Sequence, residues 1–157
     1  MLYFAYGANT NHDNMLGRCE DATFLGTGFI HGLRLVFRGV ADLEPRDRTL
    51  VAGAVWEISR RDLAALDRYE GYPSLYDRHV VLAKFHQPLH GHGREDQVIV
   101  YRMAGNRRIA PPWESYLSTV ARGYAHCSLP KMQLNLAVED AYRGKNGEPL
   151  PSWQWAS

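Results

Sequence analysis

Short apolar runs separated by turn residues fill most of this chain, and the pattern predicts many strands. The first run, Met1 to Tyr6, is apolar and aromatic and ends at Gly7-Ala8-Asn9-Thr10. Apolar runs bounded by small and polar residues are typical of strands. Further runs predict two strands paired around His31-Gly32 (22–30 and 33–38), a strand at 50–58, and the two arms of a hairpin (78–85 and 97–103). The polar residues 41–49 are expected to form a connection.

Four segments carry helical signals. Residues 11–18 can start a helix with Asn or Asp as its cap. Ser59 is followed three residues later by Asp62, the spacing of a capping box, and Gly71 and Pro73 supply the end of that helix. Two more helices are expected at 112–126 and 132–142. We therefore expect one domain over residues 1–142 and an irregular tail, rich in Gly and Pro, over 143–157.

Glu70 stands out because a carboxylate falls on the apolar face of the helix capped by Ser59. At about 100° per residue, Glu70 shares a face with Leu63 and Leu66. It also lies at the helix C-terminus, where the macrodipole disfavours negative charge. Burial and the dipole would both raise its pKa toward the range of a general base near neutral pH. The alternative is that Glu70 turns into solvent at a fraying helix end, and the sequence leaves both open.

The second candidate feature is the turn at Gly7-Ala8-Asn9, between the first strand and the first helix. Such a turn leaves backbone N–H groups pointing one way, and these groups can hold a carboxylate or a developing oxyanion. Most turns of this kind are only connections, so this feature alone assigns no function.

Composition excludes several classes of protein. A chain of 157 residues with 45% hydrophobic residues can bury one core. A net charge of +1 and the lack of a Lys/Arg cluster give no reason to expect nucleic acid as a partner. No apolar run approaches the ~20 residues that span a bilayer, and the first run lacks the basic flank of a signal peptide. Cys19 and Cys127 belong to no motif, which suits a reducing cytoplasm.

One other group of side chains suggests chemistry. His86, His90 and His92 lie within seven residues at the expected hairpin tip, and imidazoles bind Zn, Ni or Cu. No Cys or carboxylate completes a recognised ligand set, so we expect no functional metal there. Trp153 and Trp155 in the tail are expected to dock it onto the body, with a partner site as the alternative.

Two motifs together resemble the paired signatures of the γ-glutamylcyclotransferase family. They are Tyr3-Phe4-Ala5-Tyr6-Gly7-Ala8-Asn9 and Leu66-Asp67-Arg68-Tyr69-Glu70-Gly71. Further matches at Tyr76-Asp77-Arg78, Ala110-Pro111-Pro112 and Leu129-Pro130 extend the resemblance over residues 2–135. The resemblance implies an α+β fold, a small mixed β-barrel flanked by helices. It also implies that the glutamate and the N-terminal loop face each other across a cavity.

The resemblance further implies a cytoplasmic enzyme, a transferase that converts a γ-glutamyl amide or γ-glutamyl amino acid to 5-oxoproline and a free amine or amino acid. Glu70 would be the catalytic base and acid, with no metal and no cofactor. The substrate-binding residues would be Tyr3, Phe4, Ala5, Tyr6, Gly7, Ala8, Asn9 and Tyr76. The expected partner is the small γ-glutamyl substrate, with the chain a monomer or a homodimer.

The chain departs from the family pattern at two places. Ala8 replaces the usual serine of the loop, and the tyrosine that follows Leu-Pro in the family is absent after Leu129-Pro130. Two alternatives therefore stay open. One is a non-catalytic module that binds a small acidic ligand, against which a buried carboxylate argues because it is costly where nothing uses it. The other is a cyclotransferase that removes a γ-glutamyl group from an amine in one particular pathway.

Overall fold

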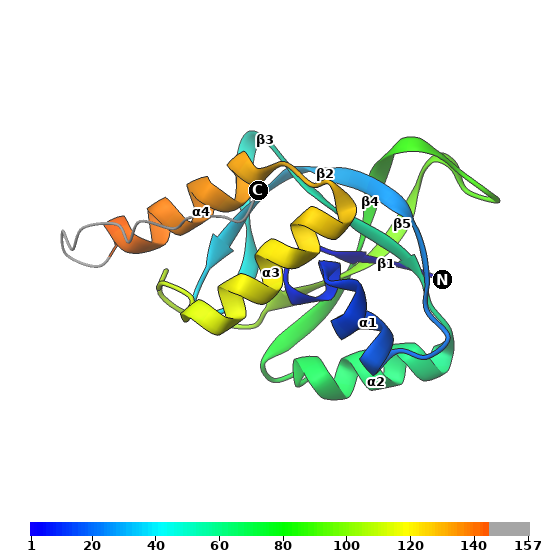
Figure 1. The fold of residues 1–157 in the computed structure, drawn as a ribbon, viewed down its shortest axis with the longest axis horizontal. Helices are drawn as coiled ribbons and strands as arrows, with labels where there is room; N and C mark the ends of the chain where they lie inside the picture. The colour runs from blue at the N-terminus through cyan, green and yellow to red at the C-terminus, as the bar shows by residue number, and fades with distance from the viewer. Residues whose placement is uncertain (145–157) are drawn as a thin grey trace.

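The structure is a computed structural model and describes residues 1–144. Within these residues five strands close into a barrel, in the order β1-β3-β2-β4-β5 (Figure 1). The strands are β1 (Leu2–Ala5), β2 (Thr23–Phe37), β3 (Ala41–Glu57), β4 (Tyr76–Leu89) and β5 (Gly93–Met103). Neighbouring strands are antiparallel except β1 and β5, which are parallel. The expected mixed β-barrel is confirmed.

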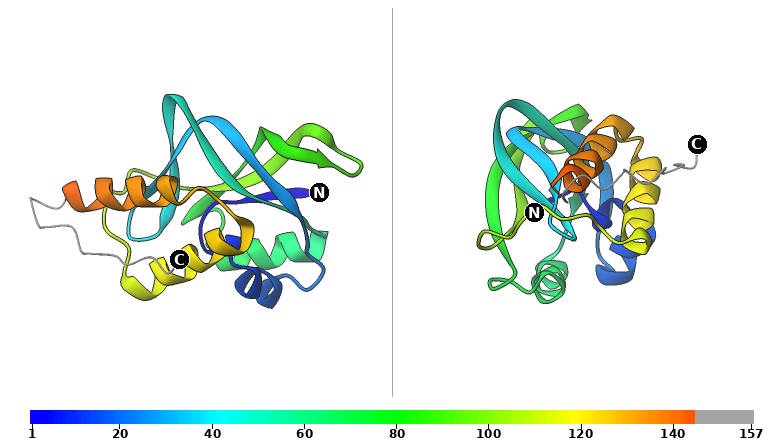
Figure 2. Two further views of the ribbon diagram at one scale, coloured as in Figure 1. Left: turned by 45° about the horizontal axis from the view of Figure 1, so that its top comes forward. Right: turned by 90° about the vertical axis from the view of Figure 1, so that its left-hand side faces the viewer.

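Four α-helices flank this barrel within the same residues. They are α1 (His12–Arg18), α2 (Arg60–Glu70), α3 (Glu114–Cys127) and α4 (Lys131–Arg143), and a 3₁₀ turn, η1 (Ala8–Thr10), precedes α1. Figure 2 shows α1, α2 and α3 gathered on one side of the barrel. The helix starts follow the sequence. The Asn11 side chain accepts from the N–H groups of Asp13 and Asn14, and Ser59 and Asp62 form the predicted capping box.

Two expectations about β2 and β3 were wrong. The segments 22–30 and 33–38 do not pair with each other but form one long strand, and His31 and Leu33 flank a shift in its register with β3. Residues 41–49 are not a connection, because β3 runs through all of them and 41–45 are the partners of residues 33–37. Their charges misled the prediction. Arg34 and Glu44 are cross-strand neighbours that form an ion pair, so the polar side chains belong to a strand with one solvated face.

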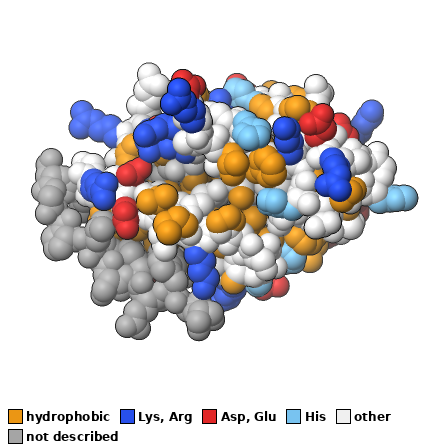
Figure 3. All heavy atoms as spheres, turned by 90° about the horizontal axis from the view of Figure 1, so that it is seen from above, with side chains coloured by type: hydrophobic (Ala, Val, Ile, Leu, Met, Phe, Trp, Pro, Cys, Tyr) orange, Lys and Arg blue, Asp and Glu red, His pale blue; other side chains and the backbone are white. Residues whose placement is uncertain are grey.

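The β4–β5 hairpin is longer than predicted, since β4 continues to Leu89. The outer side of β4 carries apolar side chains, with Val80 62% and Leu82 53% exposed. Figure 3 shows the face of the molecule seen from above, where apolar side chains occupy the middle with Lys, Arg and His side chains around them. Among the described residues no helix is long and apolar enough to cross a membrane. The predicted tail, with Trp153 and Trp155, lies outside the described residues apart from its first two, Arg143 and Gly144.

The core fixes β1 firmly, and β1 carries the N-terminal motif. Every residue of β1 is buried, and Phe4 has no exposed surface. A Cβ atom on Gly53 would lie 2.5 Å from the Phe4 ring, so the glycine of β3 makes room for this side chain. Burial of a whole phenylalanine stabilises a fold by about 2–3 kcal/mol. The turn after β1 therefore starts from a well-anchored strand.

Candidate active site

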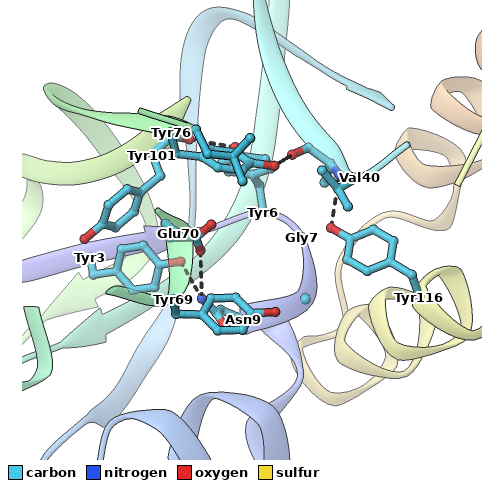
Figure 4. Close-up of a pocket in the computed structure, with 13 residues that line it drawn as sticks. Tyr3, Tyr6, Gly7, Asn9, Val40, Tyr69, Glu70, Tyr76, Tyr101 and Tyr116 are labelled. Carbon is cyan, nitrogen blue, oxygen red and sulfur yellow. Dashed lines mark hydrogen bonds between the residues drawn. The ribbon is translucent and has the colours of Figure 1, made fainter. Parts of the chain in front are cut away.

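A cavity of about 240 Å³ opens between the end of β1, the end of α2 and the starts of β3 and β4 (Figure 4). Six of the nine tyrosines of the chain line it, together with one carboxylate. The full lining is Tyr3, Tyr6, Gly7, Ala8, Asn9, Val40, Ala41, Tyr69, Glu70, Leu75, Tyr76, Tyr101 and Tyr116. An aromatic wall with few convergent polar groups is typical of a site for a small molecule.

Glu70 supplies the carboxylate, and the end of α2 directs it into the cavity. Gly71 adopts the left-handed conformation (φ 65°), and the N–H of Tyr72 returns to the Asp67 carbonyl at 2.9 Å. This ending closes the helix in a Schellman-type turn, so Glu70 stays in the last helical position and does not fray into solvent. Burial raises the pKa of Glu70 to about 7, although the positive charge of Arg18 acts in the opposite direction. A carboxyl group with this pKa can take and return a proton near neutral pH.

Asn9 links this carboxylate to β1. Its Nδ2 donates to the Tyr3 hydroxyl at 3.0 Å and lies 3.5 Å from Glu70 Oε1 (Figure 4). Arg18 donates to its Oδ1. The Tyr3 oxygen accepts from Asn9, so the hydroxyl proton of Tyr3 stays available for donation into the cavity. Burial keeps the pKa of Tyr3 well above its ordinary value.

Gly7 holds the turn close to its neighbours. A Cβ atom there would lie 2.9 Å from the Ala41 Cβ and 3.3 Å from the Tyr116 hydroxyl, so a larger residue would displace the cavity wall. The first hydrogen bond of η1 runs from the Thr10 N–H to the Gly7 carbonyl at 3.1 Å. The N–H groups of Ala8 and Asn9 precede that bond, as the first donors of a helical turn do. The turn therefore combines a tight approach with backbone donors.

The remaining tyrosines form a rigid wall. Tyr6 donates to the Tyr101 carbonyl at 2.6 Å, and Tyr76 donates to the Ala41 carbonyl at 2.7 Å. Tyr116 accepts from the Ala41 N–H at 3.0 Å. Burial raises the pKa of each of these phenols above its ordinary value. They stay protonated at neutral pH, which leaves Glu70 as the acid–base group of the lining.

Most of the predicted site residues meet here. Tyr3, Tyr6, Gly7, Ala8, Asn9 and Tyr76 all line the cavity with Glu70. Phe4 and Ala5 are buried and do not line it. They are part of β1, whose packing positions the turn.

Six lining residues were not predicted from the sequence: Val40, Ala41, Tyr69, Leu75, Tyr101 and Tyr116. Tyr69 lies inside the Glu70 motif, so that motif could have indicated it. The other five come from separate strands, loops and helices, and no local signal identifies them.

The three histidines at the hairpin tip do not converge. His86 Nδ1 lies 2.9 Å from Thr27 Oγ1, and His92 Nδ1 lies 2.8 Å from Asp96 Oδ2, whereas His90 is exposed. Within residues 1–144, no group of three His, Cys, Asp or Glu side chains has the arrangement of a metal site.

The closed mixed barrel, with Glu70 and the glycine turn lining one cavity, is the arrangement that the sequence resemblance implied. Residues 3–117 match the sequence profile of the family described as "Gamma-glutamyl cyclotransferase, AIG2-like". The chain belongs to this family, which is a family of enzymes.

Individual relatives agree with the family assignment. A γ-glutamylcyclotransferase of Bos taurus is 26% identical over 165 aligned positions, which cover 95% of this chain and 85% of that protein. A solved structure named as a γ-glutamyl cyclotransferase superimposes with a TM-score of 0.74 at 24% identity, covering 98% of this chain and 90% of that one. An uncharacterised protein of Homo sapiens gives a TM-score of 0.72 at 24% identity, covering 99% and 92%. These two structures show that the fold is shared.

Proposed function

We propose that the enzyme converts a γ-glutamyl amide to 5-oxoproline and releases the amine or amino acid that the γ-glutamyl group carried. One observation carries the proposal: Glu70, with its pKa raised by burial to about 7, lines the same cavity as the Gly7-Ala8-Asn9 turn. A base and a set of backbone donors are the two elements that an intramolecular aminolysis requires.

The proposed reaction moves two protons from the α-ammonium of the substrate to the leaving nitrogen and needs no co-reactant. Glu70 takes the first proton, and the freed amine attacks the γ-carbonyl carbon to form a five-membered ring. The tetrahedral intermediate collapses when Glu70 returns this proton to the leaving nitrogen, and the C–N bond of the amide breaks. The second proton passes from the ring nitrogen to the released amine, which leaves as an ammonium. Ring closure is already intramolecular, so the protein mainly fixes the substrate conformation and moves the proton.

The turn and the tyrosines would hold the substrate around that proton transfer. In our proposal the N–H groups near Gly7, Ala8 and Asn9 bind the γ-glutamyl end, either its oxyanion or its α-carboxylate. Tyr3, Tyr6 and Tyr76 wall the cavity. Of these three phenols Tyr3 keeps its hydroxyl proton for the substrate, because Tyr6 and Tyr76 already donate to backbone carbonyls. Phe4 and Ala5 contribute through the packing of β1. We also propose a cytoplasmic location, because Cys19 and Cys127 are free thiols.

A panel of substrates tests the proposal. The purified protein is incubated with γ-glutamyl amides of several amines and of several amino acids, and 5-oxoproline is measured by mass spectrometry. We expect release from at least one of the two groups, and the better group identifies the leaving side of the substrate. Saturable binding of these compounds without any 5-oxoproline would contradict the enzymatic proposal and support a binding module.

A further inference from the structure

We propose that Arg18 is a positioning residue of this active site, which fixes the orientation of the Asn9 amide and places a positive charge behind Glu70. The inference rests on the proposed function for its catalytic meaning. Arg18 lies outside the cavity lining, at the end of α1.

The hydrogen bond from Arg18 determines which way the Asn9 amide points. A guanidinium group has only donors, so the Asn9 atom that faces it must be the carbonyl oxygen. The amide nitrogen must then face the other way, toward the Tyr3 hydroxyl at 3.0 Å and Glu70 Oε1 at 3.5 Å. Without Arg18 the amide could turn over and set its oxygen against the carboxylate.

Arg18 is itself held in place by an aromatic ring. Its guanidinium carbon lies 3.3 Å from the centroid of the Tyr69 ring, a cation–π arrangement. Tyr69 immediately precedes Glu70 on α2 and lines the cavity (Figure 4). Arg18 therefore connects α1, the N-terminal turn and the end of α2.

The charge of Arg18 is not neutralised within the described residues, where no carboxylate forms an ion pair with it. Nearby Glu20 pairs instead with Arg61. The positive charge of Arg18 lowers the pKa of Glu70, against the larger effect of burial. This opposition keeps the carboxylate available as a base near neutral pH.

The other groups around Glu70 cannot replace this charge. Six of them are phenols that line the cavity: Tyr3, Tyr6, Tyr69, Tyr76, Tyr101 and Tyr116. Beyond Tyr6 and Tyr76 lies the carboxylate of Asp42 on β3, which forms an ion pair with Arg38. The phenols are neutral, and the charge of Asp42 is compensated by Arg38. Arg18 therefore supplies the positive charge that lowers the pKa of Glu70.

Two substitutions separate the charge from the geometry. Arg18→Met removes both, whereas Arg18→Lys keeps the charge but loses the planar fork that stacks on Tyr69 and bonds Asn9. The matched control is Arg61→Met, because Arg61 is an exposed arginine on α2 whose partner is Glu20. The titration of the Glu70 carboxyl is followed by ¹³C NMR of Cδ in Glu-labelled protein, with Glu70→Gln to assign the signal. This readout needs no substrate.

We expect Arg18→Met to raise the titration midpoint of Glu70 by about one pH unit and to lower kcat by roughly 10-fold or more, with a smaller change in KM. Arg18→Lys should leave the midpoint in place and still lower kcat. Arg61→Met should change neither. Should Arg18→Met fail to fold, Arg18→Gln removes the same charge with a polar side chain of similar length.

Three outcomes would overturn the inference or separate it from the proposed function. An unmoved Glu70 midpoint in the folded neutral variant would exclude an effect of the charge, even if kcat fell. An unchanged kcat in folded Arg18→Met, which has no donor for Asn9, would exclude the orienting role. A shift of the Glu70 midpoint in Arg18→Met, together with no release of 5-oxoproline by the wild type, would support the positioning role and contradict the proposed reaction.

Discussion

The cavity and the tip of the β4–β5 hairpin both contain several titratable or hydrogen-bonding side chains, but these side chains converge only in the cavity. At the tip, His86, His90 and His92 are close in sequence and point to different partners or to solvent. In the cavity, Asn9 and Glu70 are 61 residues apart and lie within 3.5 Å of each other.

Burial is the second difference between the two regions. The carboxyl group of Glu70 is removed from water, which raises its pKa, whereas the imidazoles of His86 and His90 belong to exposed residues. Burial disfavours the charged form of a carboxyl group, so the cavity changes the acid–base behaviour of Glu70. Proximity in sequence is therefore a weaker sign of a site than convergence from separate elements onto a buried group.

The largest effect is expected when the cavity wall is pushed apart. Gly7→Val should lower kcat/KM by ~10²-fold or more, because the new side chain would overlap Ala41 and displace the turn. The measurement is 5-oxoproline release by the purified variant. Gly17→Val is the control, since a Cβ atom at Gly17 meets nothing within 4 Å, and it should keep its activity. Full activity of Gly7→Val would show that the turn does not contact substrate.

A smaller effect is expected on stability. The pKa of Glu70 rises from 4.5 to about 7 on folding, so between these pH values the folded protein holds a proton that the unfolded chain has lost. The free energy of unfolding must then fall as pH rises through that window. Glu70→Gln has no carboxyl group to ionise, so its free energy of unfolding should exceed that of the wild type by on the order of 1 kcal/mol at pH 8, roughly 3 °C in Tm. At pH 4.5 the difference should be small.

Thermal unfolding at the two pH values measures this gain, with exposed Glu20→Gln as the control. An equal change in Tm at both pH values would mean that ionisation of Glu70 is not the cause.

The Ala8 position should respond more weakly. Ala8→Ser restores the serine of the family pattern, and one extra hydrogen bond to substrate is worth ~1 kcal/mol, or roughly fivefold in KM. We expect kcat to stay within about twofold, because the backbone N–H is unchanged. Steady-state kinetics distinguish the two parameters. A severe loss of kcat would mean that the cavity differs in shape from that of the family.

No effect is expected at the hairpin tip. Replacing His86, His90 and His92 together with Ser should leave the rate of 5-oxoproline formation unchanged, and so should a chelator, because Glu70 supplies the base in the proposed mechanism. The assay is run with and without chelator. Loss of turnover on chelation and recovery on adding Zn²⁺ would favour the metal alternative over the proposed mechanism.

The sequence was sufficient wherever a local signal determined the structure. The capping box of α2, its end at Gly71 and the carboxylate on its apolar face were all predictable from neighbours within a few residues. The resemblance to a known family supplied the barrel, which local patterns do not define.

The missed features depend on distant contacts. Asp42 and Glu44 give residues 41–45 the character of a polar connection, and only the pairing with β2 makes this segment a strand. Tyr101 and Tyr116 reach the cavity from β5 and α3, and no nearby residue marks them. The role that we propose for Arg18 depends on its contacts with Asn9 and Tyr69, which only the fold places next to it.

The most direct test of the account is the pH dependence of kcat/KM for wild type and Glu70→Gln, measured by 5-oxoproline release. In the wild type we expect kcat/KM to rise with pH through an apparent pKa of about 7 and then level off, as the base form of Glu70 accumulates. In Glu70→Gln we expect turnover to fall by ~10²-fold or more, with the rise lost. A well-folded Glu70→Gln protein with unchanged turnover and the same pH profile would remove Glu70 from the mechanism.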